Sequence, residues 1–542
     1  MLSFADYCVV GAYLVATLVI GFWSARRKSE VSSKEFFVAE RTLPWWVVGL
    51  TMVAAGISAE QMLGEVGYGV DVGLVVSNWD LAVLPALVLM VLVFLPVYLR
   101  SGITTIPEYL ERRYSKGTRA LFTLYTIFNN TCVTLVMVLA LGAAALKYFL
   151  GLDPVWGVAG LALFTGLYTV LGGMSSVAWT DTFQCILLLA GGLAVFGIGL
   201  SHVPGGWNGL ASRMPNPHLI RGLTDSCLPW PGLILLAIST NVWYCCTNQF
   251  YVQSCLGAKD QWHGQMGVLL TAFLGPVLTL CCAFPGYIAH DLLNQGLLPP
   301  LPSSGAGGVD ANATLPHLVG QFLGPGLRGF VVAGVIAAIM STVSSVVNAT
   351  ATVFAIDVYQ RWFRPQASEM RLVRIGQVAG ILTLLIAGPL SLVAIRYKYI
   401  FIYSQNAWCI LAIPIMLAFT LGVLWKRATA PAATATFLFV LPFVAVPFAL
   451  GDNSFLTLPG LGTKMHLFTF AFYVWIAAAL LMVGVSWATR APDAAAIAPY
   501  VWRVARGLPI GKRGAPVKFY ERVGFWCGVA AVMYVLIYLK YW

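Results

Sequence analysis

The sequence predicts an all-α membrane protein with about 14 transmembrane helices. Of its 542 residues, 59% are hydrophobic and only 10% are charged, and the mean hydropathy is +0.81. An ordinary soluble domain of this length does not have that composition. Apolar runs of roughly 20 residues, the length that crosses a bilayer, recur from Tyr7–Trp23 to Val523–Leu539. The lipid bilayer is therefore the expected surrounding of this chain.

The first apolar run is predicted to be a retained membrane helix, because it lacks a basic leader and a small-residue cleavage site. The formal net charge is +11. With the loop Arg26–Arg41 placed in the cytoplasm, most Lys and Arg residues fall in cytoplasmic loops, which is the positive-inside bias. The charge thus predicts an orientation with both termini outside. No basic patch interleaved with aromatic residues indicates nucleic-acid binding.

Cysteine and histidine patterns argue against a disulfide framework and a metal-dependent enzyme. Most of the 11 cysteines lie inside apolar runs, including the adjacent pair Cys245–Cys246, whose side chains point apart on a helix. The six histidines have no metal-ligand spacing. No nucleophile–base pair is evident, so we do not expect an enzyme.

Two apolar runs are interrupted by polar residues at corresponding positions. Val53–Gln61 carries Gly, Ser, Glu and Gln in mid-span, and Thr240–Gln249, five spans later, carries Asn, Thr and Gln. Broken helices at matching places in two halves indicate a transporter binding site, because the freed carbonyls can bind a cation. Since each five-helix unit has an odd number of spans, the two units are predicted to insert with opposite orientation.

The segment Gly334–Asn348 is an apolar helix with a column of hydroxyl groups. Residues three and four apart share a helix face. The residues that can present oxygen atoms together are Ala338, Ser341, Thr342, Ser344, Ser345 and Asn348. Neutral oxygens at membrane depth suit a small cation such as sodium. From this segment alone, close helix packing by small residues explains the pattern equally well.

Several motifs, in this order, resemble the sodium/solute symporter family, and within it the sodium–glucose cotransporter branch. They are Gly56–Gln61, Ile106–Tyr114, Gly172–Asp181, Trp243–Gln249, and the hydroxyl helix continuing into Phe354–Tyr359. The resemblance implies a LeuT-type fold, with a core of two inverted five-helix repeats, one extra helix before it and three after it. In a single transporter domain of residues 1–542, the expected parts are a leading helix and cytoplasmic loop (1–44), a first repeat (45–200), a second repeat (230–427) and C-terminal helices (428–542).

The resemblance also implies sodium sites. Sodium site one would use backbone oxygens of Ala54, Ile57 and Ala338 with the hydroxyls of Ser341 and Thr342, five neutral oxygens that suit sodium. Some family members have a second site, which here corresponds to Asp181, Ser341, Ser344 and Ser345. Alternatively, Asp181 lies at a wet cytoplasmic helix mouth and caps the following helix. The number of coupled sodium ions, one or two, is therefore left open.

For the solute, similarity to the sugar-transporting branch implies a pocket at the membrane midplane. Its polar residues would be Gln61, Asp80, Asn241 and Gln405, with Tyr244 as an inner lid and Trp79 and Phe401 as outer apolar walls. Carboxylate and amide groups suit the hydroxyls of a sugar or a polyol such as inositol. The chain departs from the branch in having Asp80 where glutamate is usual, Cys245 where tryptophan is usual, and no lysine between Gly264 and His290.

These observations predict a sodium-coupled symporter of a small hydroxylated solute in the plasma membrane or the bacterial inner membrane. Its expected partners are the solute, sodium and the lipid bilayer, with no nucleic acid. Two alternatives are a sodium symporter of an organic anion such as sialic acid, and a solute sensor that does not transport. An anion would call for an arginine or a helix N-terminus at its carboxylate, and no arginine is found near the predicted pocket.

Overall fold

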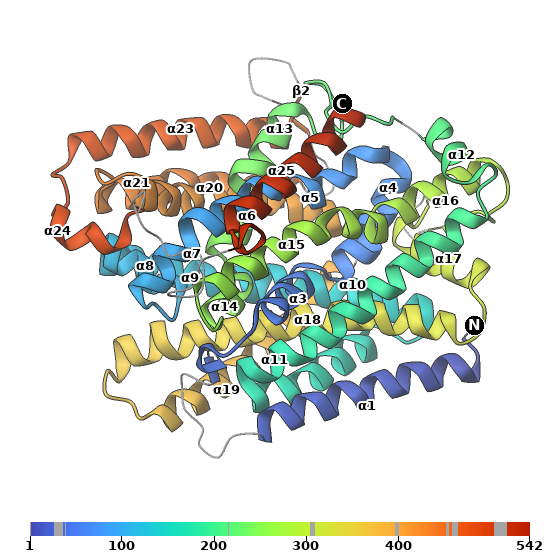
Figure 1. The fold of residues 1–542 in the computed structure, drawn as a ribbon, viewed down its shortest axis with the longest axis horizontal. Coiled ribbons are helices and arrows are strands. Elements are labelled where there is room, and N and C mark those ends of the chain that lie inside the picture. Colours follow the sequence, from blue (N-terminus) through green and yellow to red (C-terminus); the bar gives the residue numbers. More distant parts are fainter. Residues whose placement is uncertain are drawn as a thin grey trace.

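The computed structural model describes residues 2–26, 36–37, 39–214, 216–303, 309–395, 400–450, 455–457, 464–502 and 518–542. Long helices run side by side through the bundle (Figure 1), with α1 (Phe4–Arg26) along one edge and α23 (Leu467–Ala488) along the opposite edge. Most of the basic loop 26–41 lies outside the described residues. The helical fold class predicted from the sequence is confirmed.

The first five-helix unit begins with a broken helix. This helix consists of α3 (Trp45–Gly56), η2 (Glu60–Glu65) and α4 (Val66–Val72). The second span comprises η3 (Gly73–Ser77), α5 (Asn78–Leu81), α6 (Leu84–Leu89), η4 (Met90–Phe94) and α7 (Leu95–Ser101). The third span comprises α9 (Lys116–Phe128), η5 (Asn129–Thr134) and α10 (Leu135–Leu150). The short helix α8 (Ile106–Arg113) lies between these two spans. The fourth and fifth spans form α11 (Pro154–Ser201), which turns at Gly173, where φ is 60°. Only glycine adopts this conformation readily.

The break after α3 has a local cause. Ile57 is extended, with φ −108° and ψ 120°, so the helix cannot continue through it. The side chain of Ser58 then accepts a hydrogen bond from the Glu60 backbone N–H at 3.0 Å, and Gln61 Oε1 accepts one from the Ser58 backbone N–H at 2.9 Å. These side chains satisfy donors at the start of the second half-helix. The predicted interruption at 53–61 is therefore present.

The second unit repeats this pattern. Its broken helix consists of α13 (Trp230–Leu235), η6 (Leu236–Thr240), η7 (Trp243–Thr247) and α14 (Gln249–Leu256), with Asn248 extended at the break. The remaining spans are α15 (Gln261–Cys282) with α16 (Phe284–Asn294), α18 (Leu327–Val353) with η9 (Phe354–Phe363), α19 (Glu369–Ala394) and α20 (Ile400–Leu424). Short helices α12 (Gly206–Arg213), η8 (Ala311–Ala313) and α17 (Thr314–Phe322) lie in the connections.

Three further spans follow the second unit. They comprise α21 (Ala430–Val440), η10 (Leu441–Val444) and α22 (Ala445–Leu450), then α23, then α25 (Val523–Lys540), with α24 (Ala494–Ile497), η11 (Ala498–Tyr500) and η12 (Phe519–Glu521) in the connections. A short antiparallel hairpin of β1 (Phe455–Thr457) and β2 (Lys464–His466) precedes α23, with Leu456 opposite Met465. Within the described residues, this pair of strands departs from the all-α prediction.

Within the described residues, 11 helices are long and apolar enough to cross a membrane, and Trp45–Gly56 and Pro154–Val170 are shorter apolar helices. The broken helix from α13 to α14 adds a further span. The predicted total of about 14 spans agrees with these helices.

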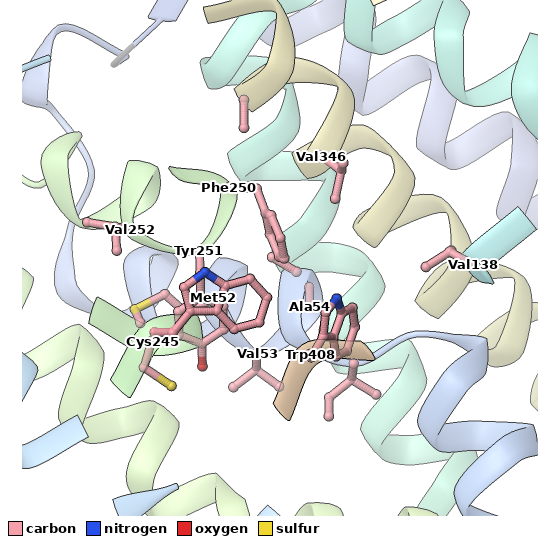
Figure 2. Close-up of a cluster of buried hydrophobic side chains, with 14 of the residues drawn as sticks. Met52, Val53, Ala54, Val138, Cys245, Phe250, Tyr251, Val252, Val346 and Trp408 are labelled. Atoms are coloured by element: carbon pink, nitrogen blue, oxygen red, sulfur yellow. The ribbon is translucent and has the colours of Figure 1, made fainter. Parts of the chain in front are cut away.

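The hydroxyl helix α18 lies inside the protein. In its most apolar window 94% of the residues are buried, compared with 28% for the peripheral α1. Figure 2 shows Val346 of α18 in the same buried cluster as Ala54 of α3, Phe250 of α14 and Trp408 of α20. The column of serines therefore faces other helices and not the lipid.

Helix α1 is fixed to the start of α18 by one carboxylate. Asp6 Oδ1 accepts hydrogen bonds from the backbone N–H groups of Gly326 and Gly329 at 2.8 and 2.7 Å. A Cβ on Gly329 would lie 2.5 Å from the Asp6 backbone, so the helices approach too closely for any larger residue. The negative charge also complements the positive end of the helix dipole.

We expect Asp6→Ala to lower the stability by about 1–3 kcal/mol, because one buried and one partly buried N–H group lose their acceptor. The matched control is Asp153→Ala, which removes an exposed cap that accepts a single hydrogen bond, from Val155 N–H. Melting temperatures of the purified proteins in detergent measure the difference. Equal melting temperatures for the two variants would contradict this role of Asp6.

Candidate functional site

The predicted residues of sodium site one meet where the α3 break contacts α18. The Ser341 hydroxyl lies 2.8 Å from the Ala54 carbonyl oxygen and 3.0 Å from that of Ala338. The Thr342 hydroxyl lies 3.3 Å from the Ile57 carbonyl oxygen and 3.2 Å from that of Ala338. The five predicted oxygen atoms therefore gather in one small, buried space.

This donor set fits a small monovalent cation. Three carbonyl and two hydroxyl oxygens are uncharged, hard ligands of the kind that replace the hydration shell of an alkali ion. The hydroxyls of Ser341 and Thr342 donate to these carbonyls, and both can rotate to direct lone pairs at an ion instead. The Ala55 carbonyl oxygen also lies 3.4 Å from the Thr342 hydroxyl, a neighbour that was not predicted.

The residues of the second predicted site also come together. Asp181 lies within α11 and is fully buried. Its Oδ1 accepts a hydrogen bond from the Ser344 hydroxyl at 3.1 Å, and its Oδ2 accepts one from Ser345 at 2.9 Å. The Ser344 hydroxyl also lies 2.8 Å from the Ser341 carbonyl oxygen. The alternative of a wet, helix-capping Asp181 is wrong, because this carboxylate is enclosed by α18.

A cavity lies beside sodium site one. Six of the seven predicted solute residues line it, namely Gln61, Trp79, Asp80, Asn241, Tyr244 and Gln405. Ile57, a predicted ligand of sodium site one, lines it as well. The cation site and the cavity therefore share the broken segment of the first core helix.

Phe401 does not line this cavity, contrary to the prediction. Its side chain is 2% exposed, and its ring packs edge-on against Trp79 with the centroids 5.5 Å apart. A Cβ on Gly64 would lie 2.7 Å from the Phe401 Cβ, so the ring is held behind the wall by close packing against η2. Trp79 alone of the two residues forms the wall.

The polar groups of the cavity offer both donors and acceptors. The Gln61 carbonyl oxygen is used by Ser58, and the Gln405 amide nitrogen donates to Glu60 Oε1 at 2.6 Å. The Gln61 nitrogen and the Gln405 oxygen are therefore left to face a solute. Asn241 Nδ2 and Asp80 Oδ2 are buried and have no hydrogen-bond partner. A hydroxyl group, which both donates and accepts, suits such a set.

Several residues of the site were not predicted as site residues. Glu60 orients Gln405, and the carboxylate in the Gly56–Gln61 motif was a signal for it. The further lining residues Thr240, Tyr251, Thr271 and Trp408 are brought in by packing. Trp408 and Thr271 lie in apolar stretches outside the quoted motifs, so no sequence signal pointed to them.

A network of ion pairs joins α8, α9 and η9 at the predicted cytoplasmic side. Arg119 Nε donates to Asp357 at 2.8 Å, and Arg119 also pairs with Glu111 at 2.5 Å. Arg361 pairs with Glu111 too, and the Thr105 hydroxyl donates to Asp357 at 3.0 Å. Partial burial tends to raise the pKa of Glu111, but Arg119 and Arg361 hold that pKa below its usual value. These contacts fix the inner end of the hydroxyl helix.

The model of the sodium:solute symporter family matches residues 36–439. The chain belongs to this family. It is 32% identical to the sodium/glucose cotransporter of Vibrio parahaemolyticus over 82% of this chain and 84% of the relative. It is 29% identical to the sodium/myo-inositol cotransporter 2 of Rattus norvegicus over 94% of this chain and 80% of that relative.

The fold is similar to a solved outward-open structure of a Na⁺-coupled sialic acid symporter, with a TM-score of 0.77 over 90% of this chain and 99% of the other. At 20% identity this likeness shows the fold. This symporter is therefore a multi-pass membrane protein of a transporter family with the predicted LeuT-type architecture.

We expect Glu111→Gln to lower the free energy of unfolding of this symporter at neutral pH by roughly 1 kcal/mol or less. The melting temperature of the variant measures this loss. Because the folded-state pKa of Glu111 is lowered, its contribution is present above the ordinary value of 4.5 and is lost as pH falls through the lowered pKa. The difference in melting temperature between parent and variant should therefore disappear at acidic pH. A gap that is constant from neutral pH downward would contradict this.

Proposed function

We propose that this chain is a sodium-coupled secondary active symporter of a small hydroxylated solute, a sugar or a polyol, and that it works by alternating access. The observation that carries the proposal is the meeting of the Ser341 and Thr342 hydroxyls with carbonyls freed by the α3 break, next to a polar cavity. Glucose and myo-inositol, which the relatives' names give, are the first solutes to test.

Sodium acts in this proposal through unequal affinity for two conformations, since an ion that bound both equally would shift neither. Sodium site one is formed by two elements from different repeats, the end of α3 with Ile57, and α18. Binding there favours the conformation in which these elements touch. Because Ile57 borders both the ion site and the cavity, an ordered break also presents Gln61 correctly to the solute.

We also propose that Asp181, Ser341, Ser344 and Ser345 bind a second sodium ion. A buried carboxylate without a cationic partner is costly at membrane depth, which supports an ion there. Each ion that enters down 100 mV and a tenfold concentration ratio releases about 3.7 kcal/mol, the sum of about 2.3 and 1.4. One ion then supports a solute gradient of roughly 500-fold, and two support one on the order of 10⁵.

Two alternatives receive less support. An organic anion such as sialic acid calls for an arginine or a helix N-terminus at its carboxylate. No Lys, Arg or His is among the described residues that line the cavity, and Asp80 would repel the anion. A sensor that does not transport has no use for an ion site shared between the repeats. We propose a transporter rather than an enzyme, in the plasma or bacterial inner membrane and with both termini outside.

Uptake into sealed proteoliposomes tests the proposal. With an inward sodium gradient, labelled glucose or myo-inositol should accumulate above its external concentration, and it should not do so when potassium replaces sodium. Dissipating the gradient with a sodium ionophore should release the accumulated solute. Sodium-dependent binding without accumulation would favour the sensor.

We expect Ser341→Ala to raise the sodium concentration for half-maximal uptake at least about tenfold, because one ligand of the ion is lost. Ser391→Ala is the matched control, since Ser391 is equally buried in α19 and its hydroxyl donates only to Gly388 of its own helix. Sodium titrations of uptake and of the melting temperature measure the effect. Unchanged titrations in Ser341→Ala would remove the assignment of sodium site one.

The second ion predicts a sigmoidal dependence of uptake on sodium in the parent protein. Asp181→Asn should make that curve hyperbolic, because it removes the charged ligand of one ion while sodium site one is kept. Thr182→Val is the control, since the Thr182 hydroxyl bonds only the Ala178 carbonyl of its own helix. A hyperbolic curve in the parent would contradict two coupled ions.

A further inference from the structure

One carboxyl group lines the solute cavity, and two more are buried near it. Asp80 lines the cavity and is 7% exposed, and its Oδ2 has no hydrogen-bond partner. Glu65 is fully buried, close enough to Asp80 to interact with it electrostatically, and neither of its carboxylate oxygens is in a hydrogen bond. Glu60 is also buried and receives only neutral donors, from Ser404 and Gln405.

The surroundings of these carboxylates are acidic or neutral. Glu65 interacts electrostatically with Asp80 and Glu60, both of the same sign. Asp80 has the Thr279 hydroxyl within hydrogen-bonding reach. Within the described chain, no Lys, Arg or His forms an ion pair with any of the three. Buried charges normally have a partner, so the cavity favours a positively charged occupant.

Aromatic rings on the same cavity indicate what kind of cation fits. Trp79, Tyr244, Tyr251 and Trp408 all line it. The Tyr244 ring centroid lies 5.1 Å from that of Tyr251 and 6.1 Å from that of Trp408, so three of the rings form one continuous wall. Aromatic walls attract organic ammonium groups through the ring quadrupole and also pack against carbon. A bare metal ion would gain little from them, because it prefers oxygen ligands.

We propose that the cavity contains an ammonium subsite at Asp80, reinforced by Glu65, and that the solute is a hydroxylated amine, such as an amino sugar or an aminocyclitol. This inference rests on the proposed function and narrows its solute class. The amine pairs with the carboxylate of Asp80, which lines the cavity. The amides of Gln61, Asn241 and Gln405 bind the hydroxyl groups.

The two carboxylates have different roles in this subsite. Asp80 is a specificity residue because it borders the cavity directly. Glu65 does not line the cavity, so it acts on the amine only through its charge. Loss of Asp80 should therefore remove the preference for an amine, whereas loss of Glu65 should weaken it.

Matched pairs of ligands test the subsite on the purified full-length protein in sodium-containing detergent buffer. D-glucosamine is compared with D-glucose and N-acetyl-D-glucosamine, and an amino-deoxy-inositol with myo-inositol. Affinities come from titrating the melting temperature. We expect each free amine to bind roughly tenfold to a hundredfold more tightly than its neutral counterpart, as for a hydrogen bond to a charged group.

Variants assign the preference to residues. Asp80→Asn should bring the affinity ratio of amine to neutral ligand close to one, Asp80→Glu should retain a preference, and Glu65→Gln should reduce it a few-fold. Asp493→Asn is the control, because that carboxylate is exposed and only caps α24. The sodium-induced rise in melting temperature, which depends on the separate ion sites, shows that Asp80→Asn is folded.

The outcomes separate this inference from the proposed function. If sugars or polyols bind in a sodium-dependent manner with equal affinity for the amine and its neutral counterpart, the ammonium subsite is wrong and the proposed function stands. A preference for amines that survives Asp80→Asn also overturns the subsite. If neither member of either pair binds with sodium, both the subsite and the solute class fall.

Discussion

The structure depends on how the carbonyl groups released by the break in the first core helix are satisfied inside a membrane. At this depth there is little water to accept or donate, so each freed carbonyl needs a protein partner or an ion. Ala54 and Ile57 meet the hydroxyls of Ser341 and Thr342 from α18. These polar contacts thereby stabilise the break in the helix. The same oxygen atoms are the ligands that a cation would use.

The hydroxyl helix is held at both ends as well as in its middle. Asp6 accepts from the backbone at its outer end, and Asp357, in the continuation η9, pairs with Arg119 at its inner end. The two anchors come from elements far apart in the sequence, the leading helix and α9. A helix fixed in this way keeps its serines directed at α3 and α11, which is what both predicted ion sites require.

Charge inside the bundle is distributed unevenly. Asp181 faces serine hydroxyls, whereas Asp80 lines the solute cavity and Glu65 is buried with neither carboxylate oxygen in a hydrogen bond. The first arrangement suits an inorganic cation held by oxygen, and the second, with its aromatic wall, suits an organic one. Both arrangements store unfavourable electrostatic energy that a positively charged occupant relieves, so binding and conformation are linked through the same carboxylates.

Local rules of sequence determined the membrane class, the approximate span count, the break near Gly56 and the face of α18 that carries Ser341. Hydropathy, helix periodicity and the polar interruption are all properties of a short stretch of chain, so they can be recognised from the sequence alone. The second break and the paired repeats followed from comparing two such stretches.

Only the tertiary structure decided which side chains meet across helices. Periodicity gives the face of a helix but not the rotation of that face relative to its neighbours, which packing sets. For that reason Phe401 was predicted to line the cavity and lies behind Trp79, while Trp408 was not predicted and lines it. The same limit applied to Asp181, whose burial among the serines of α18 depends on how two distant helices pack.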